Sequence, residues 1–188
     1  AYYFSISALY LQQKICYNYT RRKAVAMDKL EICTLASGSK GNCTYVRYGD
    51  TAILIDQGLS LKELRVRANY RGIDLSQTDA LFVTHEHSDH VKGVGAFARA
   101  YDTPVHIPAA CLGNFKTEDG IDRFFVPNEY DGEVTVKGLS VKPFRVPHDA
   151  HYTVGYRIST GKEDIAIATD LGFVSDGTLA KLSGCKAV

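Results

Sequence analysis

The chain of 188 residues has no Cys-x-x-Cys pair, only one methionine and no apolar run long enough for a membrane span. Its five cysteines are odd in number and far apart in sequence: Cys16, Cys33, Cys43, Cys111 and Cys185. This spacing gives no support for a cysteine-rich zinc knot, and it predicts free thiols in a reducing, cytoplasmic compartment. The apolar stretch Phe4–Leu11 is too short to cross a bilayer, so we expect no membrane association.

Acidic residues are absent from the first 26 positions, which hold five tyrosines and the basic cluster Arg21-Arg22-Lys23. The only methionine, Met27, follows directly. Positive charge after the apolar part is the reverse of the order in a secretory signal. We therefore predict a leader over residues 1–26 without fixed structure, from translated upstream sequence or a misplaced start. A mitochondrial-type presequence or an added surface helix is the alternative.

A surplus of positive charge is absent from the rest of the chain. Residues 27–188 carry 18 basic and 21 acidic side chains, a net charge of −3. This part therefore lacks the positive balance of a general nucleic-acid binder. With 45% hydrophobic residues in the whole chain, it can bury one core, and we expect a single domain over residues 27–188.

Histidine is concentrated in one place. The chain has six histidines, and three of them fall within the sequence His-Glu-His-Ser-Asp-His at 85–90, directly after an apolar run. His85 and His87 are two positions apart and can hold one ion, while Asp89 and His90 turn toward a second. Imidazole and carboxylate ligands suit zinc, manganese or iron. The stretch predicts a centre for two divalent ions. Three histidines within six residues argue against the alternative, a polar loop with chance histidines.

The pattern Thr-His-x-His-x-Asp-His at 84–90 resembles the signature of the metallo-β-lactamase-fold hydrolases. Three further stretches resemble one bacterial subgroup, the YycJ (WalJ) type: Ala36–Asn42, Leu54–Gly58 and Pro147–Ala150. The resemblance runs from Met27 to the last residue and implies a mixed α/β (α+β) fold, a four-layer αβ/βα sandwich. It also implies a cytoplasmic, metal-dependent nuclease with 5′-to-3′ action on double-stranded DNA. Members continue well past the point where this sequence stops, so we expect the C-terminal part of the fold to be missing.

The resemblance implies six metal ligands: His85, His87, Asp89, His90, His148 and Asp170. The three histidines at 85, 87 and 148 would hold the first ion, and Asp89 and His90 the second. Asp170 would bridge both ions, and Asp89 would also act in catalysis by orienting the attacking hydroxide. The family's last ligand, a histidine near the C-terminus, has no counterpart here, so the second ion should bind more weakly than the first.

A water between two such ions loses its proton near neutral pH, and the hydroxide can attack a phosphorus or carbonyl centre. Three residues of the Gly-rich loop, Ser39, Lys40 and Asn42, are candidates for binding a terminal phosphate. A tight turn that only begins a hairpin is the alternative. Asp56 is a candidate acceptor that orients a ligand histidine, or else a turn-capping aspartate.

Apolar alternation and turn residues predict mainly strands. These are Leu30–Leu35, a hairpin of Cys43–Tyr48 and Thr51–Ile55, Ala80–Thr84, an edge strand over Pro104–Pro108, two strands within Glu133–Val146 that break at Gly138, and the pair Val154–Ser159 and Asp164–Thr169. One helix begins at Ser60 with a Ser-x-x-Glu capping box and ends at Gly72. A second is expected over Val91–Tyr101.

Three functions follow from different observations. The subgroup-specific stretches favour a nuclease that acts on DNA. The net negative charge favours a hydrolase of a small ester, thioester or cyclic phosphate. The abrupt end of the sequence favours a metal-binding fragment without turnover. The oligomeric state is not indicated by the sequence.

Overall fold

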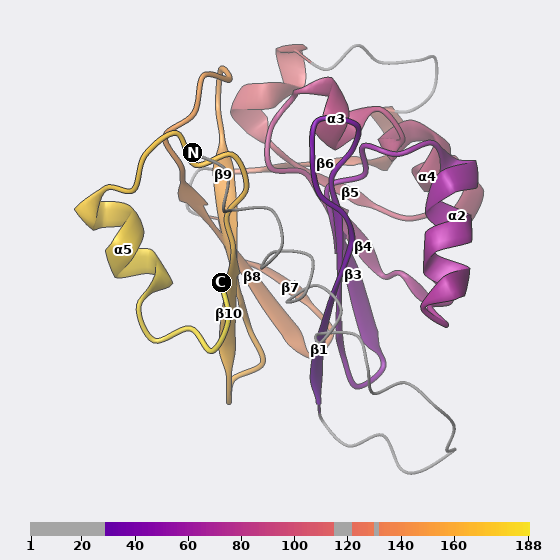
Figure 1. Ribbon diagram of the computed structural model, residues 1–188, viewed down its shortest axis with the longest axis horizontal. Coiled ribbons are helices and arrows are strands. Elements are labelled where there is room, and N and C mark those ends of the chain that lie inside the picture. The colour runs from indigo at the N-terminus through magenta and orange to yellow at the C-terminus, as the bar shows by residue number, and fades with distance from the viewer. Residues whose placement is uncertain (1–28, 115–121, 130–131) are drawn as a thin grey trace, which may run out of the picture.

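The computed structural model describes residues 29–114, 122–129 and 132–188. Within these ranges two β-sheets face each other, and helices cover the outer face of each sheet (Figure 1). The predicted mixed α/β sandwich is therefore confirmed. The predicted leader, residues 1–26, lies outside the described residues, so its separation from the domain stays a prediction.

The six-stranded sheet has the order β1-β2-β3-β4-β5-β6. Its strands are β1 (Leu30–Ala36), β2 (Cys43–Tyr48), β3 (Thr51–Ile55), β4 (Ala80–Phe82), β5 (Val105–Pro108) and β6 (Phe125–Asn128). The first three are antiparallel, whereas β3 to β6 are parallel. The hairpin predicted around Gly49-Asp50 is confirmed, and Gly49 has the positive φ, 57°, that its turn requires.

The edge strand predicted over Pro104–Pro108 is wrong in its position. β5 lies inside the sheet, between β4 and β6. The sequence analysis did not predict β6, because its mostly exposed or half-buried residues and Pro127 give no clear alternation. Three short 3₁₀-helices complete this half of the chain: Leu75–Gln77, Ala109–Asn114 and Asp122–Phe124.

Helix α2 (Leu61–Tyr70) joins β3 to β4 and begins as predicted, with the Ser60 hydroxyl accepting the N–H of Glu63. The single helix predicted over Val91–Tyr101 is wrong. The chain forms two helices, α3 (Ser88–Val91) and α4 (Val94–Tyr101), which separate at Gly93. At Gly93 the backbone lies against another loop, since an added Cβ would lie 2.0 Å from a backbone oxygen of that loop.

The four-stranded sheet is antiparallel and has the order β10-β9-β8-β7. Its strands are β7 (Val134–Val136), β8 (Leu139–Arg145), β9 (Val154–Ser159) and β10 (Asp164–Ile167). The predicted break at Gly138 is confirmed. Helix α5 (Asp176–Leu182), which the sequence analysis did not predict, covers the outer face of this sheet (Figure 1).

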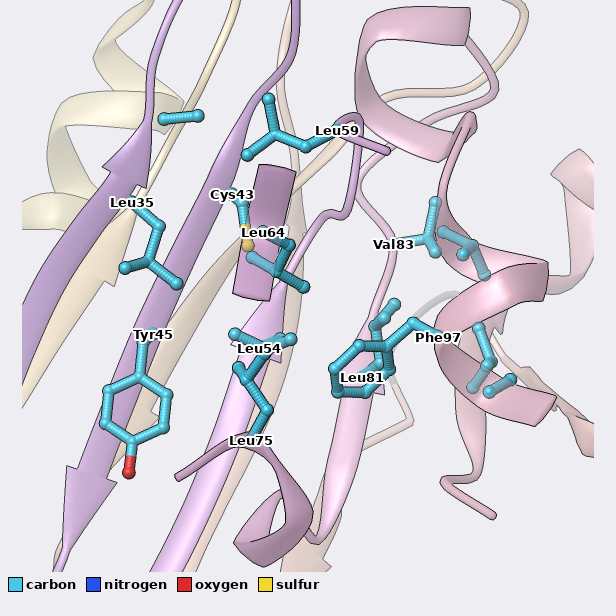
Figure 2. Close-up of a cluster of buried hydrophobic side chains, with 14 of the residues drawn as sticks. Leu35, Cys43, Tyr45, Leu54, Leu59, Leu64, Leu75, Leu81, Val83 and Phe97 are labelled. Atoms are coloured by element: carbon cyan, nitrogen blue, oxygen red, sulfur yellow. The ribbon is translucent and has the colours of Figure 1, made fainter. Parts of the chain in front are cut away.

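Two buried cores fix the strands that lead to the candidate site. Ile53 and Ile55 of β3 point into the core between the sheets. Leu54 points instead into the core beneath α2 and α4 (Figure 2). In β4, Phe82 points into the core between the sheets, and Leu81 points into the core beneath α2 and α4. A strand that is buried on both faces reads as a continuous apolar run, which is why both strands could be recognised from the sequence.

Three of the five cysteines agree with the prediction of free thiols, and Cys16 lies outside the described residues. Cys43, Cys111 and Cys185 form no disulfide. Burial raises the pKa of the Cys111 thiol to about 12, so the thiol stays protonated at neutral pH. Among the described residues, no helix has the length and apolar character that a bilayer crossing needs.

Candidate metal centre

Four strand ends converge at one edge of the two sheets. Asp56 follows β3, and the stretch 84–90 follows β4. His148 and Asp170 come shortly after β8 and β10 of the other sheet. The structure thus brings together predicted ligands that follow strands of both sheets.

The first group of predicted ligands consists of His85, His87 and His148, each of which offers one ring nitrogen within 4.8 Å of the others. The Nε2 atom of His148 lies 3.2 Å from Nδ1 of His87. The three ring centroids are 4.7 to 5.0 Å apart. These three histidines are the group that the family resemblance implied for the first ion.

The second group consists of His85, His90 and Asp170. One oxygen of Asp170, Oδ2, lies 2.7 Å from Nε2 of His90 and 3.7 Å from Nε2 of His85. Asp170 thus lies beside His90 and beside His85, the histidine that belongs to both groups. Asp89 belongs to neither group, although its Oδ2 atom is 3.6 Å from Nε2 of His90.

His85 is the residue that the two groups share. Its side chain is fully buried, and Nδ1 lies 2.9 Å from the hydroxyl of Thr84. That hydroxyl donates its own proton to Asp56, so it can only accept a hydrogen bond from His85. The Nε2 atom then carries the lone pair, and it has no hydrogen-bond partner among the described residues.

A buried acceptor without a partner costs free energy unless something binds it, and a divalent cation fits this atom and its neighbours. Burial, together with the positive charge of neighbouring histidines, lowers the pKa of His85 to about 4. The imidazole is therefore neutral at physiological pH, which is the form that binds metal. The residues present fit a metal centre.

The Asp56 carboxylate is 1% exposed and accepts three hydrogen bonds. The donors are the Thr84 N–H at 2.8 Å, the Thr84 hydroxyl at 2.8 Å and Nδ1 of His90 at 2.7 Å. Asp56 is thus placed where the predicted acceptor behind a ligand histidine would lie. Burial alone would lower the pKa of His90, but the hydrogen bond and charge of Asp56, with the charges of Asp170 and Asp89, raise it.

Both Asp56 and Asp170 have left-handed backbone conformations, with φ of 59° and 53°. Such values are uncommon outside glycine, although aspartate and asparagine tolerate them better than most residues. Two of them at one site show that the surrounding contacts hold the backbone in place.

The three candidate phosphate-binding residues of the Gly-rich loop do not share one environment. Ser39 and Lys40 are exposed and can be reached by a substrate. Asn42 is 8% exposed, and its side-chain nitrogen lies 3.1 Å from Asp89 Oδ2 and 2.9 Å from His90 Nε2. The structure therefore places Asn42 within the ligand cluster and leaves the other two on the surface.

Close backbone packing holds the loop after β3 against the metal-binding stretch. The N–H of Gln57 donates to the His90 carbonyl at 2.8 Å, and the N–H of Gly93 donates to the Gln57 carbonyl at 2.9 Å. A Cβ atom on Gly58 would lie 1.6 Å from the Asp89 carbonyl oxygen. Only glycine allows this approach. Backbone packing therefore explains why the stretch Leu54–Gly58 ends in glycine, a reason that the sequence analysis had not identified.

Glu86 is a residue that the sequence analysis did not single out. One carboxylate oxygen accepts the backbone N–H of His151 at 2.8 Å, and the other lies 3.6 Å from the thiol of Cys111. Although burial opposes it, hydrogen bonding from the backbone and from the thiol lowers the pKa of Glu86. The signal available in the sequence was its position between His85 and His87, two of the predicted ligands.

Two histidine-containing groups that could hold metal ions lie at the strand ends of a two-sheet sandwich, and the family comparison agrees with this arrangement. The model of the metallo-beta-lactamase superfamily matches residues 36–185, so the chain belongs to this superfamily. This family implies divalent metal ions, and the histidine cluster is able to bind them. A solved structure, the metallo-beta-lactamase fold protein YhfI from Bacillus subtilis, superposes with a TM-score of 0.64 at 16% identity, covering 80% of this chain and 65% of that one.

Two curated relatives are more similar in sequence. Exodeoxyribonuclease YycJ of Bacillus anthracis is 34% identical over 84% of this chain and 61% of its own length. Exodeoxyribonuclease WalJ of Streptococcus pneumoniae is 33% identical over 76% of this chain and 54% of its own length. The resemblance to the YycJ (WalJ) type is thereby confirmed. The chain spans less than two thirds of the length of these relatives.

Proposed function

We propose that this protein is a metal-dependent nuclease that acts on DNA as a 5′-to-3′ exonuclease, with two divalent ions, zinc or manganese, or else iron. The observation that carries the proposal is the buried Nε2 atom of His85. It lacks a partner among the described residues and lies where two groups of ligands meet. The names of the two exodeoxyribonuclease relatives support the choice of substrate.

When bound, two divalent ions supply an acidified water and positive charge for the developing negative charge on phosphorus. The residues of the chain would prepare the site for this chemistry. Asp56 holds His90 with its Nε2 atom directed at the ligand cluster. The carboxylate of Asp170 offsets part of the positive charge, and Asp89 is proposed to orient the attacking water.

The exposed residues Ser39 and Lys40 are proposed to contact a phosphate of the substrate. They lie on the loop that ends at Asn42, beside Asp89, so a phosphate bound there would approach the centre from that side. A hydrolase of a small ester, thioester or cyclic phosphate is the second candidate. The net charge of −3 over residues 27–188 favours it, because a general nucleic-acid binder is usually basic.

The first experiment is the metal content of the purified full chain by elemental analysis, with His87→Ala as the control for adventitious binding. About two ions per chain, lost on substitution, would support the proposed centre. One ion would favour the metal-binding fragment without turnover that the sequence also suggested, and no ion would refute the proposed centre. A matching loss of hydrolysis in His87→Ala would tie the activity to the centre.

Salt dependence then separates the two substrate classes. A nuclease that neutralises several phosphates loses affinity steeply as salt rises, with a slope of about −0.9 per phosphate on logarithmic axes for duplex DNA. Cleavage of end-labelled duplex DNA with this dependence supports the nuclease. Turnover of a small ester or cyclic phosphate that barely responds to salt would support the second candidate. The cytoplasmic location stays a prediction from the spacing of the cysteines.

A further inference from the structure

The side chain of Asn42 has a fixed orientation. Its Oδ1 atom accepts the backbone N–H of Gly38 at 2.9 Å. A nitrogen in that place would set two donors against each other, so the carboxamide cannot be turned over. The Nδ2 atom therefore faces the ligand cluster, 3.1 Å from Oδ2 of Asp89 and 2.9 Å from Nε2 of His90.

The backbone of Asn42 is fixed as well. Its N–H donates to the carbonyl of Asp89 at 2.7 Å, and its carbonyl accepts the N–H of Gly58 at 2.9 Å. The residue is 8% exposed. Asn42 is thus held by the Gly-rich loop, by the loop after β3 and by the metal-binding stretch. Its Nδ2 atom lies within hydrogen-bond distance of the Gly38 carbonyl oxygen, Asp89 Oδ2 and His90 Nε2.

We propose that Asn42 is a positioning residue for the second metal ion, acting through Asp89. This inference rests on the proposed two-ion centre. The Asn42 amide holds Oδ2 of Asp89 at 3.6 Å from Nε2 of His90. Two ligands on one tetrahedral ion, each about 2.0 to 2.2 Å from it, are about 3.4 Å apart. Without the amide, Asp89 is free to turn toward solvent, because its side chain is 28% exposed.

The chemistry of the side chain explains why an asparagine stands here. An aspartate would place a carboxylate against Asp89, and the two like charges would repel. A serine hydroxyl ends closer to the backbone than Nδ2 does. Outer partners of metal ligands typically contribute 10- to 100-fold to metal affinity. Loss of the Asn42 amide should therefore weaken the second ion by about that factor and leave the three-histidine site unchanged.

The test is a cobalt(II) titration of the full chain after removal of metal with a chelator, followed by absorbance and by competition with a chelating dye. Wild type is compared with Asn42→Ala, and Ser37→Ala, at an exposed position, is the control for general disturbance of the same loop. We expect Asn42→Ala to bind the first ion as wild type does and the second about 10 to 100 times more weakly. Ser37→Ala should bind both ions like wild type.

Two results would overturn the inference. If Asn42→Ala weakened both ions equally, Asn42 would only support the loop. If the second ion bound equally well or more tightly, the amide would be irrelevant to the ion or compete with it. Should Asn42→Ala fail to fold, shown by thermal melting of the metal-free chain, Asn42→Ser is measured in its place with the same expectation. The wild-type chain is titrated before any variant. If it binds fewer than two ions, the two-ion centre itself is refuted.

Discussion

The Oδ2 atom of Asp56 lies 2.7 Å from Nδ1 of His90, and both side chains are almost completely buried. A carboxylate can only accept here, so Nδ1 carries a proton, and Nε2 is the atom that His90 directs at the ligand cluster. This contact links a residue at the end of β3 to the proposed second ion.

Asp56→Asn should therefore weaken the second ion by about 10- to 100-fold. Asparagine tolerates the left-handed backbone at this position, and its oxygen can still accept the Thr84 N–H. Its NH₂ group would then face His90 and drive the imidazole to the tautomer with the proton on Nε2. Metal titration of the full chain checks this, and an unchanged second affinity would show that the contact does not set the tautomer.

The metal-free protein should lose stability as the pH falls from about 6.5 to about 4. The folded state holds the pKa of His85 at about 4, against 6.5 as the ordinary value. The unfolded chain therefore takes up a proton over this range before the folded chain does, at a cost of up to about 3 kcal/mol. Below about pH 4 the stability that depends on the neutral form of His85 is lost completely.

The measurement is urea denaturation of wild type and His85→Gln at several pH values, in the presence of a chelator. The variant should show a weaker decline from pH 6.5 to 4. His90 should act in the opposite sense, because its pKa is raised in the folded state. Its contribution is present at low pH and is lost as the pH rises through its folded pKa. Parallel pH profiles for wild type and His85→Gln would contradict the assignment.

Gly58→Ala should destabilise the fold by about 3 kcal/mol or more, because the new Cβ would lie 1.6 Å from the Asp89 carbonyl oxygen. The contact is with backbone, so no side-chain rotation can relieve it. Gly113→Ala is the matched control, since nothing lies within 4 Å of its Cβ position. Denaturation of both variants decides the question: equal stabilities would mean that the two loops separate easily.

Glu86→Ala should weaken the first ion, whereas Glu86→Gln should retain most of the affinity. Glu86 connects the metal-binding stretch to the loop that carries His148, through the N–H of His151. Glutamine keeps an oxygen for that N–H, but alanine does not. We expect about a tenfold loss in Glu86→Ala. A titration in which the two variants agree would indicate that the carboxylate charge, rather than the hydrogen bond, matters.

The elements that could be predicted from the sequence depend on local signals. The hairpin of β2 and β3 follows from alternation on both sides of Gly49-Asp50, and α2 follows from its capping box at Ser60. The predicted ligands on the stretch 85–90 could be recognised because three histidines in six residues are rare, whatever the fold. The structure places them together, and their roles as ligands stay a prediction.

The remaining features depend on contacts between distant parts of the chain. The separation of α3 from α4 at Gly93 comes from the loop after β3, and nothing in the residues around Gly93 indicates that loop. Lys40 and Asn42 are only two residues apart in one loop, yet Lys40 is exposed and Asn42 is buried. Only the approach of Asp89 and Gly58 decides which of them faces the cluster.

His85 and His87 follow β4 of the six-stranded sheet, whereas His148 follows β8 of the other sheet and is 61 positions away from His87. An ion held by all three would act as a cross-link between the two halves of the sandwich, comparable to a disulfide across a long loop. Loss of the metal in a cell would then remove this cross-link as well as the ions proposed for catalysis. The protein would become more susceptible to proteolysis, and its abundance would follow the supply of metal.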